Sequence, residues 1–401
     1  MSDFALTEEQ VAFRDLARKF ARNEVAPIAS QADRIADPTE AWNAVAGVIQ
    51  KGLQLGFGKL GIPEQYGGLG GGLTELFILA EELAVADSGI AMCMINTATL
   101  PMMIALGGTE AQRDKWLRPT AEDETGTYAW AAAASEPTGG NEIVCPVPEP
   151  RLGVHTHAVR DGDGYRITGH KAWTSNAGAA QVYLVLARTR MDKANLEACN
   201  FFIFERNTPG FTVGKPEDKL GNRTLRQAEI YFEGLRVPEE DRLGEEGAGL
   251  HALESVYRGN AVVLAGICIG IARAAYNTAL AYTQQRIIWG QATIKHQAVA
   301  SRLVKMRTSI EAARALVEKL IWALEHPQSS DGLDKLTRIA KVYASEMVAQ
   351  VASDAMYLLG GYGYTKDYPV EKLVRDSLVF RFLEGANEVH ELFTASELQP
   401  I

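Results

Sequence analysis

Hydrophobic residues recur at helical spacing in the first part of the chain. After Thr7, with Gln10 placed to complete a capping box, the segment Val11–Phe20 carries apolar residues three and four positions apart. A second apolar run covers Leu73–Ala86. The glycines of 67–72 before it lack the Lys-Ser/Thr ending of a phosphate-binding loop, so we interpret them as a connection between helices. This part of the chain is therefore expected to be helical.

The pattern changes to short strands in the middle of the chain. Residues 165–169 alternate between polar and apolar, and continuous apolar runs follow at 182–187 and 201–204. Turn signals flank these segments, among them Asp-Gly-Asp-Gly at 161–164 and Thr-Pro-Gly at 208–210. We predict a compact antiparallel β domain here.

Long amphipathic helices are predicted in the last part of the chain. They cover Ala272–Arg286, Gln297–Glu325 and Lys335–Leu359, and Pro369 stands where a further helix can begin. Long helices that meet at short polar breaks are typical of a four-helix bundle.

Together these patterns predict an α+β fold in three domains. A chain of 401 residues is long enough to divide its core in this way. The expected domains are an N-terminal helical domain at 1–125, a central β domain at 126–240 and a C-terminal helical bundle at 241–401.

The composition is that of a globular protein with an acidic balance. Hydrophobic residues make up 47% of the chain, and the formal net charge is −10. No basic stripe interleaved with aromatic residues is visible, so a nucleic-acid partner is not expected. The apolar stretch Ala261–Ala272 is too short to span a membrane, and residues 1–10 do not resemble a signal peptide. We expect a cytoplasmic protein without membrane insertion.

Neither cysteines nor histidines indicate a disulfide framework or a metal site. The four cysteines are far apart and form no Cys-x-x-Cys pair. His155 and His157 stand close together, but no third ligand accompanies them. His155 ends a proline-containing segment, 143–155, that we interpret as a surface loop.

Four short segments carry motifs that are weak one by one. They are Ser-Glu-Pro-Thr-Gly-Gly at 135–140, Lys-Ala-Trp-Thr-Ser-Asn at 171–176, Gly-Gly-Tyr-Gly-Tyr at 360–364, and Arg-Asp at 375–376 leading to Leu-Glu-Gly-Ala at 383–386. In this order and at these separations they resemble the acyl-CoA dehydrogenase family, over nearly the whole chain. The resemblance implies that family's three-domain fold, bound FAD and an acyl-CoA substrate.

Glu384 is the strongest candidate for a catalytic base. The α-proton of a thioester is a very weak acid, so its removal needs a positioned base and stabilisation of the developing enolate. The apolar neighbours of Glu384 would raise its pKa, and Gly385 leaves room for a thioester near the backbone. By resemblance, Glu384 is the base, its N–H helps to hold the thioester carbonyl, and Gly385 contacts the substrate. The alternative is a solvated glutamate at a helix end.

Some members of the family carry the base on a different helix. Alignment on Gly-Ile-Ala-Arg at 270–273 puts that position at Asn260, which cannot accept a proton, while Glu254 lies nearly two turns earlier. The same alignment puts Ala261 where many members have an arginine beside the thioester. Arg258, one turn earlier, is therefore the candidate substrate contact.

A flavin site is implied in the β domain. Trp173 resembles the tryptophan that packs on the isoalloxazine, and Ser175 resembles the hydroxyl residue that bonds the N5 edge. Without the resemblance, Trp173 would be interpreted as a core aromatic residue. Further positions that the resemblance implies are Ser135, Gly140 and Thr174 for the cofactor and Asn141 for the substrate.

The last domain supplies the remaining cofactor positions. Arg286 begins the segment Arg-Ile-Ile-Trp-Gly, and its guanidinium suits a pyrophosphate, with Trp289 near the adenine. In the family these residues reach the FAD of a neighbouring subunit, which implies a homodimer or homotetramer, with a hetero-oligomer as the alternative. An exposed helix-end cation is the alternative for Arg286. The other implied positions are His296, Gln297, Gly360, Gly361, Ala386 and Glu388, the last two standing where Thr/Ser and Gln are common.

The predicted function is FAD-dependent dehydrogenation of an acyl-CoA to the trans-2-enoyl-CoA, with an electron-transfer flavoprotein as acceptor. A flavin monooxygenase or oxidase of the same fold is one alternative, and a non-catalytic acyl-CoA-binding subunit is another. Retention of Glu384, together with Trp173 and Arg286, favours the dehydrogenase. The sequence leaves the acyl chain open; Met92 and Met94 suggest core filling or a compact acyl pocket.

Overall fold

Helices form the first part of the chain, as the apolar spacing predicts. The structure is a computed structural model that describes residues 6–329 and 332–398, with the side chains of 251–255 and 329 excepted. Thr7 and Gln10 form the predicted capping box, in which each side chain bonds the backbone N–H of the other residue. The helices of this part are α1 (Glu8–Phe20), α2 (Ala26–Asp33), α3 (Pro38–Gln54), α4 (Leu73–Ala86), α5 (Ser88–Thr99), α6 (Pro101–Gly107) and α7 (Glu110–Glu122).

An eight-stranded sheet follows, in the order β6-β7-β3-β2-β4-β5-β8 with β1 paired to β4. Most neighbours are antiparallel, as expected, but β1 lies parallel to β4, and β2 meets β4 in parallel at one residue pair. The difference follows from the connections, because β1 is joined to β2 by a long irregular segment instead of a hairpin. The strands are β1 (Trp130–Ala133), β2 (His157–Asp161), β3 (Gly164–Ser175), β4 (Val182–Arg188), β5 (Cys199–Glu205), β6 (Phe211–Pro216), β7 (Gln227–Pro238) and β8 (Arg242–Leu243).

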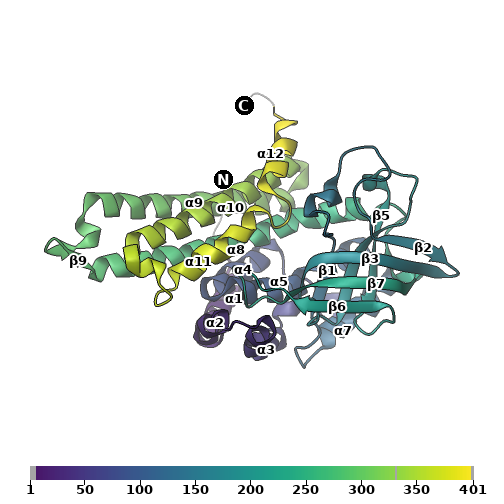
Figure 1. Ribbon diagram of the computed structural model, residues 1–401, viewed down its shortest axis with the longest axis horizontal. Helices are drawn as coiled ribbons and strands as arrows, with labels where there is room; N and C mark the ends of the chain where they lie inside the picture. The colour runs from purple at the N-terminus through teal and green to yellow at the C-terminus, as the bar shows by residue number, and fades with distance from the viewer. Residues whose placement is uncertain (1–5, 330–331, 399–401) are drawn as a thin grey trace.

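Long helices return after the sheet and run side by side away from it (Figure 1). A small hairpin joins the first two of them at the end remote from the sheet (Figure 1). The elements are α8 (Gly249–Gln285), β9 (Ile287–Ile288), β10 (Gln291–Ala292), α9 (Gln297–Glu325), α10 (Leu333–Leu359), α11 (Val370–Ser377) and α12 (Asn387–Ala395).

Helix α8 begins 23 residues earlier than the predicted start at Ala272, since its first residue is Gly249. Glycine is unfavourable inside a helix, and two glycines interrupt the apolar stretch before Ala272. Here Gly266 and Gly270 have a packing role. A Cβ on Gly270 would stand 2.4 Å from the carbonyl oxygen of Glu81, so the glycine allows α4 to approach α8 closely. Tertiary packing outweighs the low helix propensity.

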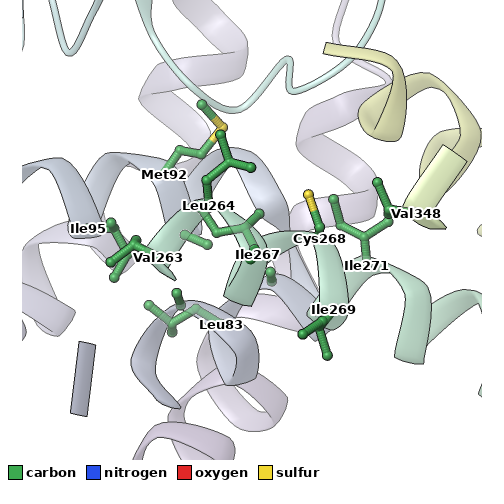
Figure 2. Packing of buried hydrophobic residues seen from close by; sticks show 14 of the residues in the cluster. Leu83, Met92, Ile95, Val263, Leu264, Ile267, Cys268, Ile269, Ile271 and Val348 are labelled. Atoms are coloured by element: carbon green, nitrogen blue, oxygen red, sulfur yellow. The ribbon is translucent and has the colours of Figure 1, made fainter. Parts of the chain in front are cut away.

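Apolar side chains from α4, α5, α8 and α10 meet in one large core (Figure 2). Met92 is buried in this core with Leu264 and Ile267. Met94 is fully buried, and its thioether lies against Gly52 between α3 and α5. Both methionines therefore fill the core, the first of the two interpretations that the sequence left open.

Two helical stretches are long and apolar enough to cross a membrane, by length and composition. They are Ser88–Gly107 and Val256–Gln285, and 78% and 72% of their most apolar windows are buried inside the protein. The second is longer than the apolar stretch recognised in the sequence, because the helix continues through its glycines. Their burial is that of core helices.

A buried ion-pair network joins the three parts of the fold. Lys372 of α11 contacts Asp87, the N-cap of α5, at 2.8 Å, and also pairs with Asp376. Asp376 accepts a 2.6 Å hydrogen bond from the backbone N–H of Asn222, in the segment between β6 and β7. Burial alone would lower the pKa of Lys372, but Asp376 and Asp87 together raise it above its usual value. Lys372 is therefore held charged between two carboxylates.

We predict that Lys372→Met destabilises the folded protein by about 3 to 5 kcal/mol, because two buried carboxylates would lose their counterion. The midpoint of urea unfolding measures the change. Lys51→Met is the matched control, since the Lys51–Glu24 pair is exposed and should contribute less than about 1 kcal/mol. Equal midpoints for the two variants would contradict the structural role given to Lys372.

Candidate active site

Glu384 occupies an unusual turn between the end of α11 and the start of α12. Its φ is +56°, and that of Gly385 is +90°. A left-handed backbone costs a non-glycine residue about 1 to 2 kcal/mol and persists only where the surroundings enforce it. The turn breaks the helical path and sets Glu384 on an exposed part of the surface.

The carboxylate of Glu384 is surrounded by polar groups from two long helices. Burial by nearby protein atoms raises the pKa of Glu384, whereas the charge of Lys341 and a hydrogen bond from the Asn260 side chain act in the opposite direction. The net shift is upward. The residue as a whole is exposed to solvent, and the raised pKa makes its carboxyl group a better proton acceptor.

Asn260, the position aligned with the alternative base, therefore lies beside Glu384. Glu254 precedes it on α8 by six residues. The side chain of Glu254 lies outside the described part of the structure. Arg258, the candidate substrate contact, pairs with Asp334 at 2.7 Å.

Trp173 projects from a bulge in β3. The register between β3 and β7 shifts between Lys171 and Thr174, and Trp173 has a φ of +60°. Its side chain is 59% exposed, so it is not a core aromatic residue. Gln227 of β7 donates to the carbonyl of Trp173 and, at 3.1 Å, to the hydroxyl of Ser175. An exposed ring and a hydroxyl group thus lie next to each other.

Thr174, between them, is buried, so its side chain does not lie on the exposed surface that Trp173 and Ser175 share. Of this strand segment, Trp173 and Ser175 remain the side chains available to a ligand. A contact from Thr174 would have to come from its backbone.

The segment after β1 is fixed to β3 by a buried ion pair. Glu136 contacts Lys171 at 2.9 Å and accepts the N–H groups of His155 and Thr156. Burial would raise the pKa of Glu136, but Lys171 and these hydrogen bonds hold it below its usual range. This anchor places the residues on either side of it, the half-buried Ser135 and the exposed Gly140 and Asn141.

Ser135 faces Gly140 across a tight turn. A Cβ on Gly140 would stand 3.5 Å from the Ser135 hydroxyl oxygen, and nothing would touch a Cβ on Gly139. Gly139 has a φ of +142°, a backbone that side chains disfavour. The turn therefore presents a hydroxyl group and bare backbone on one surface.

A cavity of about 590 Å³ opens at the far end of the long helices, a volume typical of ligand pockets. Tyr282, Arg286, Ile288, Gly360, Gly361 and Tyr362 are among its lining residues. A Cβ added at Gly360 or at Gly361 would have no other described atom within 4 Å. Packing within the described chain therefore requires neither glycine. Arg286 lies over the ring of Tyr362 and forms no ion pair with any described residue.

His296 and Trp289 belong to the hairpin beside this cavity. His296 bonds the carbonyl of Ile288 at 3.1 Å, which ties the hairpin to the start of α9. Trp289 is 90% exposed at the tip, with a φ of +52°. Gln297, the first residue of α9, is also exposed. The ring of Trp289 thus lies largely exposed at the tip of the hairpin, with an edge-on contact to His296 at a centroid distance of 5.6 Å.

The predicted cofactor residues form two groups that one chain does not bring together. At 1.5 Å per residue, α8 carries Arg286 roughly 40 Å from Asn260 and hence from Glu384. Figure 1 shows the hairpin at the opposite end of the helices from the sheet that carries Trp173. Ala386 and Glu388 lie with Glu384, at the N-terminus of α12.

Comparison with known proteins identifies the family of this chain. Family models described as the N-terminal, middle and C-terminal domains of acyl-CoA dehydrogenase match residues 7–124, 131–235 and 247–399. The short-chain specific acyl-CoA dehydrogenase of Megasphaera elsdenii is 36% identical, with 99% of each chain covered. The chain belongs to the acyl-CoA dehydrogenase family.

Solved structures resemble this acyl-CoA dehydrogenase family member over their whole length. Butyryl-CoA dehydrogenase from Megasphaera elsdenii has a TM-score of 0.88 and 34% identity, with 99% of each chain covered. A chain solved in work on the electron transferring flavoprotein of Acidaminococcus fermentans has a TM-score of 0.89 and 33% identity, with full coverage of both chains. The chain is accordingly an FAD-dependent oxidoreductase that dehydrogenates an acyl-CoA.

Several residues of the dehydrogenase site were not predicted from the sequence. Tyr257, Lys341, Asn387 and His390 all surround the Glu384 turn. The sequence did hold a signal for Lys341, because this charged residue falls within the apolar stripe of α10. The burial of His390 in the short helix α12 appears only in the structure.

We expect Arg286→Ala to weaken FAD retention about 10- to 100-fold, because a charge-assisted hydrogen bond to a phosphate is worth about 1.5 to 3 kcal/mol. Titration of the apoprotein with FAD measures the affinity. Arg118→Ala is the control, since Arg118 forms an exposed pair with Asp114 on α7. Equal FAD affinity in the two variants would remove Arg286 from the cofactor site.

Proposed function

We propose that Glu384 removes the α-proton of the acyl-CoA thioester. The residue is exposed to solvent, its pKa is raised, and an amide stands at the alternative base position beside it. The raised pKa supports this role, because a stronger base matches the weak acidity of the α-proton more closely. The observation that carries the proposal is the left-handed turn between α11 and α12 in which this glutamate lies.

The backbone of the same turn supports the second requirement, stabilisation of the enolate. With Glu384 and Gly385 at positive φ, Gly385 presents no side chain towards a ligand. We infer that the N–H of Glu384 donates to the thioester carbonyl, where negative charge develops as the proton leaves. The base and the donor would then come from one residue, which fixes their relative positions.

The residues of the β domain fit an isoalloxazine ring. Trp173 offers an exposed aromatic face, and Ser175 offers a hydroxyl group beside it. Ser135 and the bare turn at Gly140 supply a further polar edge. FAD, when bound, supplies the acceptor for the hydride that leaves the β-carbon. The role of the protein chain is to hold the ring and to orient the α- and β-carbons with respect to it.

We propose that a second subunit completes the FAD site. Arg286 and Trp289 follow the end of α8 that is remote from the sheet, too far away to reach a ring held at Trp173 in the same chain. An exposed arginine and a bare Gly360-Gly361 turn around a cavity suit a pyrophosphate and adenosine. A homodimer or a homotetramer built from such dimers would satisfy this geometry.

We further propose an electron-transfer flavoprotein as the electron acceptor. This rests on the resemblance to a chain solved in work on such a flavoprotein. An oxidase or monooxygenase of the same fold is the second candidate, and it would react rapidly with oxygen once reduced. A non-catalytic subunit would lack flavin, which the exposed Trp173–Ser175 pair argues against.

Our first prediction for this function is that Glu384→Gln abolishes most of the flavin reduction while acyl-CoA still binds. The amide keeps the shape of the side chain but accepts no proton, and loss of a general base costs about 10² to 10⁴ in rate. Anaerobic stopped-flow spectroscopy, which follows flavin bleaching, measures the rate.

Glu254→Gln is the control for this experiment and should reduce at close to the wild-type rate. Glu254 is the nearest glutamate before Asn260 along α8. If Glu384→Gln reduced normally and Glu254→Gln did not, the base would lie on α8 and the proposal would be wrong.

A second prediction concerns the acyl chain, which we expect to be short. The support comes from the short-chain specific relatives. Met92 and Met94 fill the core, so they give the prediction no support. A panel of linear, branched and cyclic acyl-CoAs, assayed with an artificial electron acceptor, should give its highest kcat/KM on a compact acyl group. A higher kcat/KM on a long linear chain would contradict the prediction.

A further inference from the structure

We propose that His390 and Lys341 are positioning residues that hold the Glu384–Gly385 turn in its left-handed conformation and thereby aim the Glu384 carboxyl group. The inference rests on the proposed role of Glu384 as the base. It goes further because it assigns a task to two side chains that do not themselves meet the substrate.

His390 fixes the first carbonyl of the turn. Its Nε2 lies 2.9 Å from the carbonyl oxygen of Glu384, and since a carbonyl only accepts, this nitrogen carries the proton. The imidazole also packs under the next residue, where a Cβ on Gly385 would stand 2.7 Å from Nε2. The ring is buried and stacked on Tyr257 of α8, with centroids 5.4 Å apart and planes 16° apart. Its position is therefore set by α8.

Lys341 fixes the second carbonyl from the opposite helix. Its ammonium is fully buried and donates to the carbonyl of Gly385 at 2.7 Å and to the side-chain oxygen of Asn387 at 2.7 Å. Ser345, one turn along α10, donates to the same Asn387 oxygen, and Asn387 donates to Glu346. Lys341 forms no salt bridge within the described residues.

The charge of Lys341 is felt by nearby carboxylates, that of Glu384 among them, but none of those described lies within salt-bridge distance of its ammonium. A buried ammonium that served only stability would be expected to pair with a carboxylate, as Lys372 does with Asp87 and Asp376. Instead, Lys341 donates to the turn itself, and burial lowers its pKa to about 8. Consecutive carbonyls, those of Glu384 and Gly385, are thus held by donors from α12 and α10.

The geometry explains how a strained residue is kept in place. A glutamate at φ +56° would relax if its carbonyl were free to rotate. With both carbonyls engaged, the side chain and N–H of Glu384 are left to face the ligand. A shift of about 1 Å in such a group can slow catalysis about 100-fold.

The experiment compares His390→Phe, which keeps a stacking ring without a donor, with His390→Gln, which keeps an N–H donor. His390→Phe should lower the limiting rate of anaerobic flavin reduction about 10- to 100-fold while the acyl-CoA Kd changes little. His390→Gln should recover most of that rate. Hydrogen–deuterium exchange in the peptide covering 378–390 should rise in His390→Phe and stay near wild type in His390→Gln.

Lys341→Met is the second variant and removes the other donor at nearly constant length. It should reproduce the slower reduction and faster exchange, and it keeps the test valid if His390→Phe does not fold. His326→Phe is the matched control, because His326 is exposed at the end of α9 and stacks on Trp322.

Unchanged exchange and reduction rates in both donor-free variants would overturn the inference. An equal loss in His390→Gln and His390→Phe would also overturn it, because the donor would then not matter. These outcomes are distinct from failure of the proposed function. If Glu384 is not the base, Glu384→Gln reduces normally, whereas the exchange measurement still reports whether His390 and Lys341 hold the turn.

Discussion

A buried ion-pair network of two carboxylates and one ammonium group connects the three parts of this protein. Lys372 bridges Asp87 at the start of α5 and Asp376 at the end of α11, and Asp376 also holds the backbone of Asn222 beside β7. Charges removed from water are tolerated only when paired and hydrogen-bonded, so the three segments cannot separate without a large cost in free energy. The helical parts and the sheet are therefore placed relative to one another by electrostatics as well as by apolar packing.

The active site depends on this placement because its parts come from separate domains. Asp376 precedes Glu384, the base in our proposal, by one short helical segment, and Asn222 leads into the strand whose Gln227 bonds Ser175. The network thus connects the segment before Glu384 with the strand beside Trp173 and Ser175. His390 and Lys341 in turn hydrogen-bond the backbone carbonyls of Glu384 and Gly385. Coarse positioning comes from buried ion pairs, and fine positioning comes from hydrogen bonds to carbonyls.

Left-handed backbone marks each part of the proposed site. Trp173, Trp289 and Glu384 all have positive φ, although none is a glycine. Such residues cluster where the surroundings enforce a conformation for a functional reason. Trp173 and Trp289 carry exposed aromatic rings at a bulge and at a hairpin, and Glu384 lies in the turn before α12. In our proposal, each of these side chains meets a ligand.

The sequence by itself determined the order of helical and stranded regions and, through its motifs, which residues we propose for the site, among them Glu384, Trp173 and Ser175, because periodicity and local motifs are properties of neighbouring residues. It missed the early start of α8, where Gly270 is explained only by the approach of α4. It also missed His390 and Lys341, since their partners come from other helices, and it could not assign Met94 to the core. Only the tertiary structure decided these points. Contacts between distant segments depend on how the helices pack, and no local pattern encodes that packing.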